Sequence, residues 1–242
     1  MEEDGFCFAK KRKSKSRSKF KSSLPVNDLN SRIATNEIDF GAFYKKVEKY
    51  SNSDSFLRFF GYVRDTVNKA RASISAGDAK CPPLEDVVCY GLGDFFSSYQ
   101  SFYQLLLLLK LKSAFSLTVQ IYDPIFDLQH CKFLQSQGLS IIKNNEFCQR
   151  SVDKYTLFFM PHCEREMYEN LLAANFDTNL KYCLIVGNSF ECMHTAQSFS
   201  TSSLKYKFLY YSLEYLYEIP MINSFEPEDC FNNMSIHVFN KK

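Results

Sequence analysis

The sequence of 242 residues contains no tryptophan, only eight glycines and seven prolines, and no long hydrophobic run. The longest aliphatic run, Leu105–Leu109, is far shorter than the ~20 apolar residues that cross a bilayer. The N-terminus begins acidic and then becomes basic, without the apolar stretch of a secretory signal. We therefore expect a soluble intracellular protein with no membrane-spanning segment.

The cysteines lack the spacing of a zinc site. There are nine of them, an odd number, with no Cys-x-x-Cys pair and no Cys-x-x-His pair. We therefore expect reduced thiols, most of them small core side chains, and no metal site. Cys81-Pro82 has the form of a haem-sensing Cys-Pro pair, although such dipeptides are common by chance.

Charge is unevenly distributed along the chain. The net charge is +2 overall, but residues 1–21 hold eight basic and three acidic residues, which leaves an acidic body. A basic segment interleaved with serine cannot bury a core, so residues 1–35 are predicted to form a disordered tail. The tail suits a nuclear-import signal or a solvated, phosphorylated segment. Because the body offers no basic stripe, we do not expect it to bind nucleic acid.

Hydrophobic side chains are plentiful, at 45% of the residues, which is enough for a sizeable core. Residues 36–80 are predicted to form a helical region that is broken near residues 51–54. Its second half repeats apolar residues at helical spacing, which predicts a stripe that docks on the main domain. The stripe consists of Phe56, Phe60, Val63, Val67 and Ala70.

Residues 81–242 form the predicted main domain, in which strands and helices alternate as they do in βαβ units. Helices are expected at 98–112, 127–137 and 164–174, and strands at 87–90, 117–122, 139–142, 155–160 and 182–186. A late helix over 203–217 and a final edge strand over 234–239 complete the prediction. The fold class is α/β, a Rossmann-like doubly wound parallel sheet of about five strands with N-terminal helices.

Two of these strands end abruptly in small, polar or reactive residues. The strand at 87–90 is followed by Gly91-Leu-Gly93, and the strand at 155–160 by Pro161-His-Cys163. In an open α/β sheet such breaks lie at the carboxyl edge, where ligands bind. The doubly wound order places these two strands side by side, so we expect their loops to face each other.

The first loop matches a dinucleotide-binding loop only in part. Gly91 and Gly93 fit the first two glycines of G-x-G-x-x-G, but Phe96 replaces the third, and Asp94 puts a negative charge where a phosphate would sit. The glycines could equally make a tight turn. Ser97 and Ser98 are expected to cap the next helix, and they could also hold an anion there.

Three further residues could carry chemistry at this edge. Asp123 could accept hydrogen bonds from a ribose or cap the turn at Pro124. His162 could act as an acid, a base or a ligand, or be hydrogen-bonded structure. Cys163 could be a thiolate favoured by the following helix, or a structural thiol. No Ser-His-Asp order, HExxH or P-loop is present, so the case for an enzyme rests on location alone.

Several segments, in order and spacing, resemble the sensitivity-to-red-light-reduced family, or SRR-like domain. The resemblance covers about residues 84–195. One departure is that Ala173 and Phe176 stand where the family usually carries tryptophans. The matching segments are Cys89-Tyr-Gly-Leu-Gly93, Gln104-Leu-Leu, Tyr122-Asp-Pro124, Phe159-Met-Pro-His-Cys163, Asn170-Leu-Leu172 and Gly187-Asn-Ser189.

The resemblance implies an intracellular regulatory protein of the cytoplasm and nucleus. Relatives are linked to circadian rhythm and light signalling, to regulation of haem biosynthesis, and to microtubule or proteolytic homeostasis. Expected partners are a small-molecule ligand, haem or another protein. The resemblance brings no catalytic residue and no cofactor. The alternative is a nucleotide- or metal-dependent enzyme that uses Asp123 and His162. The ligand-binding candidates are Gly91, Gly93, Ser97, Ser98, Asp123, His162, Cys163 and Asn188.

Overall fold

The computed structural model describes residues 38–74, 83–195, 205–222 and 225–240. The predicted basic tail and the Cys81-Pro82 pair lie outside these residues, as does the boundary predicted near residue 80.

A seven-stranded sheet forms the centre, in the order β3-β2-β1-β4-β5-β7-β6. The first five strands run parallel, while β7 pairs antiparallel with both β5 and β6. The predicted α/β doubly wound fold is confirmed, and β6 is the one strand of the described sheet that was not expected. The strands are β1 (Asp86–Tyr90), β2 (Thr118–Tyr122), β3 (Ser140–Ile141), β4 (Thr156–Met160), β5 (Cys183–Asn188), β6 (Leu216–Pro220) and β7 (Met234–Phe239).

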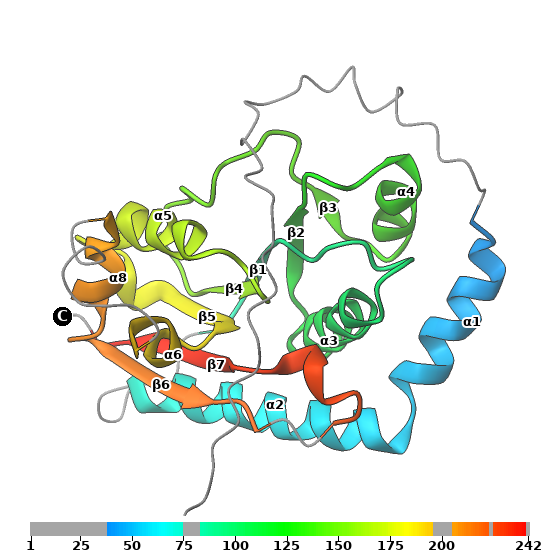
Figure 1. The fold of residues 1–242 in the computed structure, drawn as a ribbon, viewed down its shortest axis with the longest axis horizontal. Coiled ribbons are helices and arrows are strands. Elements are labelled where there is room, and N and C mark those ends of the chain that lie inside the picture. The colour runs from blue at the N-terminus through cyan, green and yellow to red at the C-terminus, as the bar shows by residue number, and fades with distance from the viewer. Residues whose placement is uncertain (1–37, 75–82, 196–204, 223–224, 241–242) are drawn as a thin grey trace, which may run out of the picture.

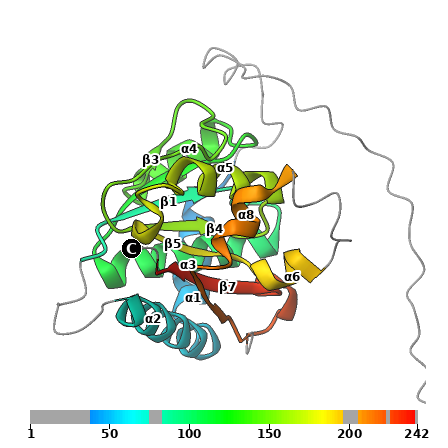
Figure 2. The same cartoon turned by 90° about the vertical axis from the view of Figure 1, so that its left-hand side faces the viewer.

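Helices cover both faces of the sheet (Figures 1 and 2). Because side chains alternate along a strand, Val87 and Cys89 of β1 join one core cluster, and Val88 and Tyr90 join the other. The first cluster takes in α1 (Phe40–Ser51), α2 (Asp54–Ile74), α3 (Tyr99–Phe115) and α4 (Leu128–Ser136). The second takes in α5 (Arg165–Asn175), α6 (Phe190–Thr195) and α8 (Lys207–Ser212). None of the described helices combines the length and apolar character needed to cross a membrane.

The two N-terminal helices dock on the first face, α2 through most of its predicted stripe, although Phe59 is buried and Phe60 only partly so. Helix α1 begins after Asp39, whose carboxylate accepts a hydrogen bond from the N–H of Ala42. Helix α2 runs alongside β7 and α3 (Figure 1). Its Phe59 is 1% exposed and stacks on Phe231 with the ring centroids 4.6 Å apart. Phe231 ends the short 3-10 helix η3 (Glu228–Phe231), so α2 also holds the C-terminal part of the chain.

The predictions for the last forty residues were wrong in two places. Within the described residues, which resume at 205, the expected helix over 203–217 is represented by the six-residue α8, and β6 starts at Leu216. In this segment, pairing with β7 over five register positions outweighs the helical spacing. The expected edge strand at 234–239 instead lies between β5 and β6, and all six of its residues are buried. The edge strand is β6.

We predict that Phe59→Ala lowers the free energy of unfolding by about 3–5 kcal/mol, because it leaves a cavity between α2 and η3. Leu57 lies on the same helix but is 39% exposed, so Leu57→Ala should cost less than about 1 kcal/mol. Urea unfolding followed by circular dichroism measures both. Equal losses in the two variants would show that α2 is not docked through Phe59.

Candidate functional site

The loops after β1 and β4 pack directly on each other. The two strands are parallel neighbours, so both loops leave the carboxyl edge together. Gly91 has a φ of +70°, and a Cβ atom built on it would lie 2.9 Å from Sγ of Cys163. The Cys163 thiol in turn donates to the carbonyl of Tyr90, 3.3 Å away. The close approach therefore requires glycine at position 91.

Asp123 ties the glycine loop to the end of β2. Its Oδ2 accepts from the N–H of Gly93 at 2.8 Å, and its Oδ1 accepts from the N–H of Ile125 at 3.0 Å. Burial raises the pKa of Asp123, and these two N–H bonds offset part of that rise. The carboxylate thus connects two backbone segments, as the turn interpretation predicts. No ribose is needed to explain its position.

Ser98 caps α3 as expected, whereas Ser97 lies one residue before the cap and the prediction that it caps the helix was wrong. Ser98 is the N-cap residue, and its hydroxyl accepts from the N–H of Ser101 at 3.3 Å. Ser97 is exposed, and its N–H donates to Asp94. Asp229 of η3 covers this helix end through the hydroxyl of Tyr99 and the amide of Gln100. A carboxylate of the chain itself therefore lies beside the first turn of α3.

His130 was not predicted to have a role, but it links this loop to α4. Its ring is buried between Asp127, at 2.7 Å from Nδ1, and Asp94, at 3.1 Å from Nε2. Burial alone would raise the pKa of both carboxyls. Hydrogen bonds, including those to His130, outweigh burial and lower the pKa of each. The sequence signal was the three-residue spacing from Asp127 to His130, which suits an N-cap and its N3 partner.

His162 is held at both its backbone and its ring. Its N–H donates to Oδ1 of Asn188 at 2.7 Å, and its Nε2 lies 3.2 Å from the carbonyl of Cys230. Because a carbonyl only accepts, Nε2 carries a hydrogen. The amide of Asn188 also donates to the carbonyl of Cys163 at 3.0 Å. Asn188 therefore orients the turn after β4, in which His162 has a φ of 54°.

The Cys163 thiol lies inside the protein. It is 7% exposed, and burial raises its pKa well above the usual value, with nearby Cys148 and Cys89 acting in the same direction. The protonated thiol is also the form that donates to the Tyr90 carbonyl. This geometry favours the structural interpretation over the thiolate.

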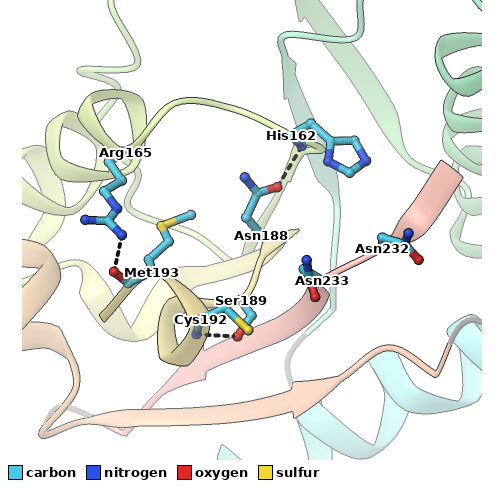
Figure 3. A pocket seen from close by; sticks show the side chains of 8 residues that line it. All are labelled: His162, Arg165, Asn188, Ser189, Cys192, Met193, Asn232 and Asn233. Atoms are coloured by element: carbon cyan, nitrogen blue, oxygen red, sulfur yellow. Dashed lines mark hydrogen bonds between the residues drawn. The ribbon is translucent and has the colours of Figure 1, made fainter. Parts of the chain in front are cut away.

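A pocket of about 410 Å³ opens beside His162 (Figure 3). Among the described lining residues, only Arg165 carries a permanent charge, and Met193 is the main apolar side chain. The guanidinium of Arg165 donates to the carbonyl of Met193. Because none of these described residues is a carboxylate, the lining suits a small polar ligand that bears an anionic group. The lining residues are His162, Arg165, Asn188, Ser189, Cys192, Met193, Asn232 and Asn233.

Only two of the predicted site residues, His162 and Asn188, line this pocket. Four others are connected by contacts: Asp123 holds Gly93, Gly91 packs on Cys163, and Cys163 bonds to Asn188. Ser97 and Ser98 instead contact Asp94 and the first turn of α3. Sequence reasoning missed Asn232 and Asn233 because it assigned no direction to the last strand. As β7 is antiparallel, its first residues lie at the carboxyl edge of β5. Within the described ranges, no group of three or more His, Cys, Asp or Glu residues is placed to hold a metal ion.

A buried pair of a glutamate and a histidine lies behind the pocket lining. Glu218 and His237 face each other across β6 and β7, with Oε1 and Nε2 3.6 Å apart. The His237 ring is fully buried and stacks on Phe190, with the centroids 4.2 Å apart. Burial alone would raise the pKa of Glu218. Interactions with His237 and with the hydroxyls of Ser189 and Ser235 lower it instead, to about 2.

The family model of the SRR1 domain matches residues 63–238, which is most of the chain. The chain belongs to the SRR1 domain family. It is 35% identical over 117 residues to the protein SENSITIVITY TO RED LIGHT REDUCED 1 of Arabidopsis thaliana, covering 47% of this chain and 42% of that protein. It is 39% identical over 123 residues to the SRR1-like protein of Mus musculus, covering 48% and 47% respectively. The chain therefore matches about half the length of these SRR1 relatives.

Among solved structures, the SRR1 chain is similar to an S-adenosylmethionine-dependent methyltransferase from Clostridium acetobutylicum. The TM-score is 0.42 at 9% identity, covering 84% of this chain and 98% of the other. It is also similar to the 23S rRNA methyltransferase ErmE, with a TM-score of 0.41 at 10% identity, covering 73% and 68%. At these values the likeness carries no information about activity.

Aromatic side chains connect the end of α5 with α8. Phe176 packs against Phe208 of α8 with the ring centroids 5.2 Å apart. Tyr211 and Tyr215 complete the aromatic surroundings of Phe176. Ala173, the other position singled out in the sequence, is exposed.

We predict opposite effects for two glycine substitutions. At Gly93, where φ is +82°, a Cβ would lie 2.4 Å from Oγ of Ser101, so Gly93→Ala should lower the free energy of unfolding by about 2–3 kcal/mol. Gly61 lies within α2, where a Cβ meets nothing within 4 Å, so Gly61→Ala should raise it by about 0.5–1 kcal/mol. Chemical denaturation measures both. A stable Gly93→Ala variant would contradict the packed loop.

A second prediction concerns pH. The ordinary pKa of Glu218 is 4.5 and its folded value is about 2, so its ionised form stabilises the fold above pH 4.5. That contribution, about 3 kcal/mol, is lost as pH falls from 4.5 towards 2. Glu218→Gln should therefore be less stable than the wild type at pH 6, and the gap should narrow on acidification. Denaturation at several pH values tests this, with exposed Glu214→Gln as the control. A difference in the free energy of unfolding between the wild type and Glu218→Gln that stays constant with pH would contradict the stabilising role of ionised Glu218.

Proposed function

We propose that this chain is a regulatory SRR1-family protein that binds a small polar ligand with an anionic group in the pocket beside His162. We propose that it acts in the cytoplasm and nucleus. We propose further that it takes part in circadian rhythm and in the regulation of haem biosynthesis. We infer an anionic ligand from Arg165, which is the one permanently charged side chain among the described lining residues, none of which is a carboxylate. The name of the Arabidopsis relative, which refers to red-light sensitivity, supports a signalling role.

The pocket is preorganised for binding. Asn188 fixes the backbone of His162, and the Cys230 carbonyl fixes its ring, so little side-chain freedom remains to be lost when a ligand binds. Among the described contacts, Arg165 uses only Nη2, in its bond to Met193, which leaves guanidinium N–H groups for a carboxylate or phosphate. The amides of Asn232 and Asn233 supply both donors and acceptors at the opposite wall.

The second candidate function is an enzyme that uses Asp123 and His162. The raised pKa of Asp123 favours it, because perturbed carboxyls are common at catalytic sites. However, both oxygens of Asp123 accept backbone N–H groups in the glycine loop, whereas His162 faces a different set of partners at Asn188 and Cys230. The geometry therefore supports binding better than joint catalysis by these two residues.

We predict that the full-length protein is stabilised by compounds with a carboxylate or phosphate. The compounds to screen by thermal shift are small organic acids, nicotinamide and adenine nucleotides, S-adenosylmethionine and haem. A ligand at about 100 times its dissociation constant adds ~2.7 kcal/mol. This should raise the unfolding midpoint by several degrees, at roughly 2–4 °C per kcal/mol. Arg165→Gln should remove the shift, and Lys132→Gln, at an exposed position on α4, should keep it.

Three other outcomes would count against the proposal. A shift that survives Arg165→Gln but is lost in Asp123→Ala would place the ligand at the glycine loop and support the enzyme. Haem binding that depends on His162 but not on Arg165, seen in the absorption spectrum, would point to iron ligation. A flat screen with well-folded protein would reject a small anionic ligand altogether.

The regulatory role has its own test in cells that lack the protein. If the pocket carries the function, Lys132→Gln should restore rhythm period and haem level, and Arg165→Gln should not. Rescue by both variants would separate the cellular role from the pocket.

A further inference from the structure

Three buried polar atoms of β6 and β7 have no hydrogen-bond partner within the described part of the chain. They are Oε1 of Glu218, Oγ of Ser235 and Nε2 of His237. Ser235 and His237 are 0% exposed. Glu218 pairs directly with His237, and Ser235 is two residues from His237, so all three side chains lie on one face of the sheet. Unpartnered polar atoms cost stability when buried, so three together indicate a shared partner.

The donor and acceptor roles of the three side chains determine which hydrogen bonds that partner must make. Nδ1 of His237 lies 3.2 Å from the carbonyl of Ile185, and because a carbonyl only accepts, Nδ1 carries a hydrogen. In the neutral ring Nε2 is then an acceptor, and it faces Oε1 of Glu218, another acceptor, at 3.6 Å. Even for a charged ring, 3.6 Å is too long for a direct N–H···O bond. The hydroxyl of Ser235 has one hydrogen and cannot serve both acceptors.

We propose that one water molecule is bound between Glu218, Ser235 and His237, behind the pocket. It donates to Oε1 of Glu218 and to Nε2 of His237, and it accepts from the hydroxyl of Ser235. Buried waters typically make about three hydrogen bonds, which equals the number of unpartnered atoms here. A metal ion fits less well, because the set offers only one carboxylate and one imidazole, and no larger ligand group exists among the described residues.

Ser189 connects this water site with the pocket. It lines the pocket, is 7% exposed, and its hydroxyl is among the groups that lower the pKa of Glu218. Glu218 also accepts from the N–H of Glu191 at the start of α6, through its other oxygen. The water therefore completes the hydrogen bonding behind the pocket wall. The inference does not depend on any ligand in the pocket.

The test is a crystal structure of the full chain at a resolution that shows ordered water, with elemental analysis of the same sample. We expect one density peak at hydrogen-bond distance from all three atoms, and no metal in stoichiometric amount. An empty site with Glu218 and His237 in direct contact would overturn the proposal, and so would a stoichiometric metal.

A matched pair of serine variants sharpens the test. Ser235→Ala removes one partner of the water, so the peak should weaken or vanish. Ser212 is also fully buried, but its hydroxyl donates to the Leu209 carbonyl at 2.8 Å, so Ser212→Ala should leave the peak intact. Full occupancy in Ser235→Ala would contradict the proposed geometry. If that variant fails to fold, the wild-type structure and its metal content decide the question alone.

Discussion

The contact between Gly91 and Cys163 is the constraint on which this edge of the sheet depends. Only a residue without a Cβ lets the loop after β1 approach the Cys163 sulfur so closely. With its thiol bonded to the carbonyl of Tyr90, Cys163 fixes the turn after β4, and its own carbonyl holds the amide of Asn188. Asn188 then holds the backbone of His162. The position of the histidine therefore follows, step by step, from a glycine in the loop after the neighbouring strand β1.

The same constraint explains why the pocket lies beside β5 and β7. The loops after β1 and β4 are in direct contact through Gly91 and Cys163, which leaves no space between them. Asp229 of η3 accepts from Tyr99 at the start of α3. The Cys230 carbonyl joins the two sides by accepting from Gln104 of α3 and from the ring of His162. Polar side chains gather on the other side of His162, where α5, α6 and the start of β7 meet (Figure 3). Arg165 is surrounded there by amides and hydroxyls, so this pocket suits a small anion.

Local signals in the sequence predicted much of this. The alternation of strands and helices, the Ser98 cap and the adjacency of β1 and β4 follow from propensity and chain topology. The arrangement of the last forty residues could not be predicted from local sequence. The placement of β7 between β5 and β6 depends on pairing between segments some fifty residues apart. For that reason Asn232 and Asn233 were missed. Asp123 was predicted with two roles open, since a carboxylate that binds a ribose and one that binds its own backbone look identical in sequence.

Thiol labelling of the native protein tests the loop contact most directly. Each cysteine is followed by mass spectrometry after brief exposure to a small alkylating reagent. The account predicts that Cys163, sealed beneath Gly91, stays unlabelled while the exposed Cys192 reacts within the same time. Labelling of Cys163 as fast as Cys192 in folded protein would mean that the two loops stand apart. The cleft between β1 and β4 would then be open, and the argument that places the ligand beside His162 would fail.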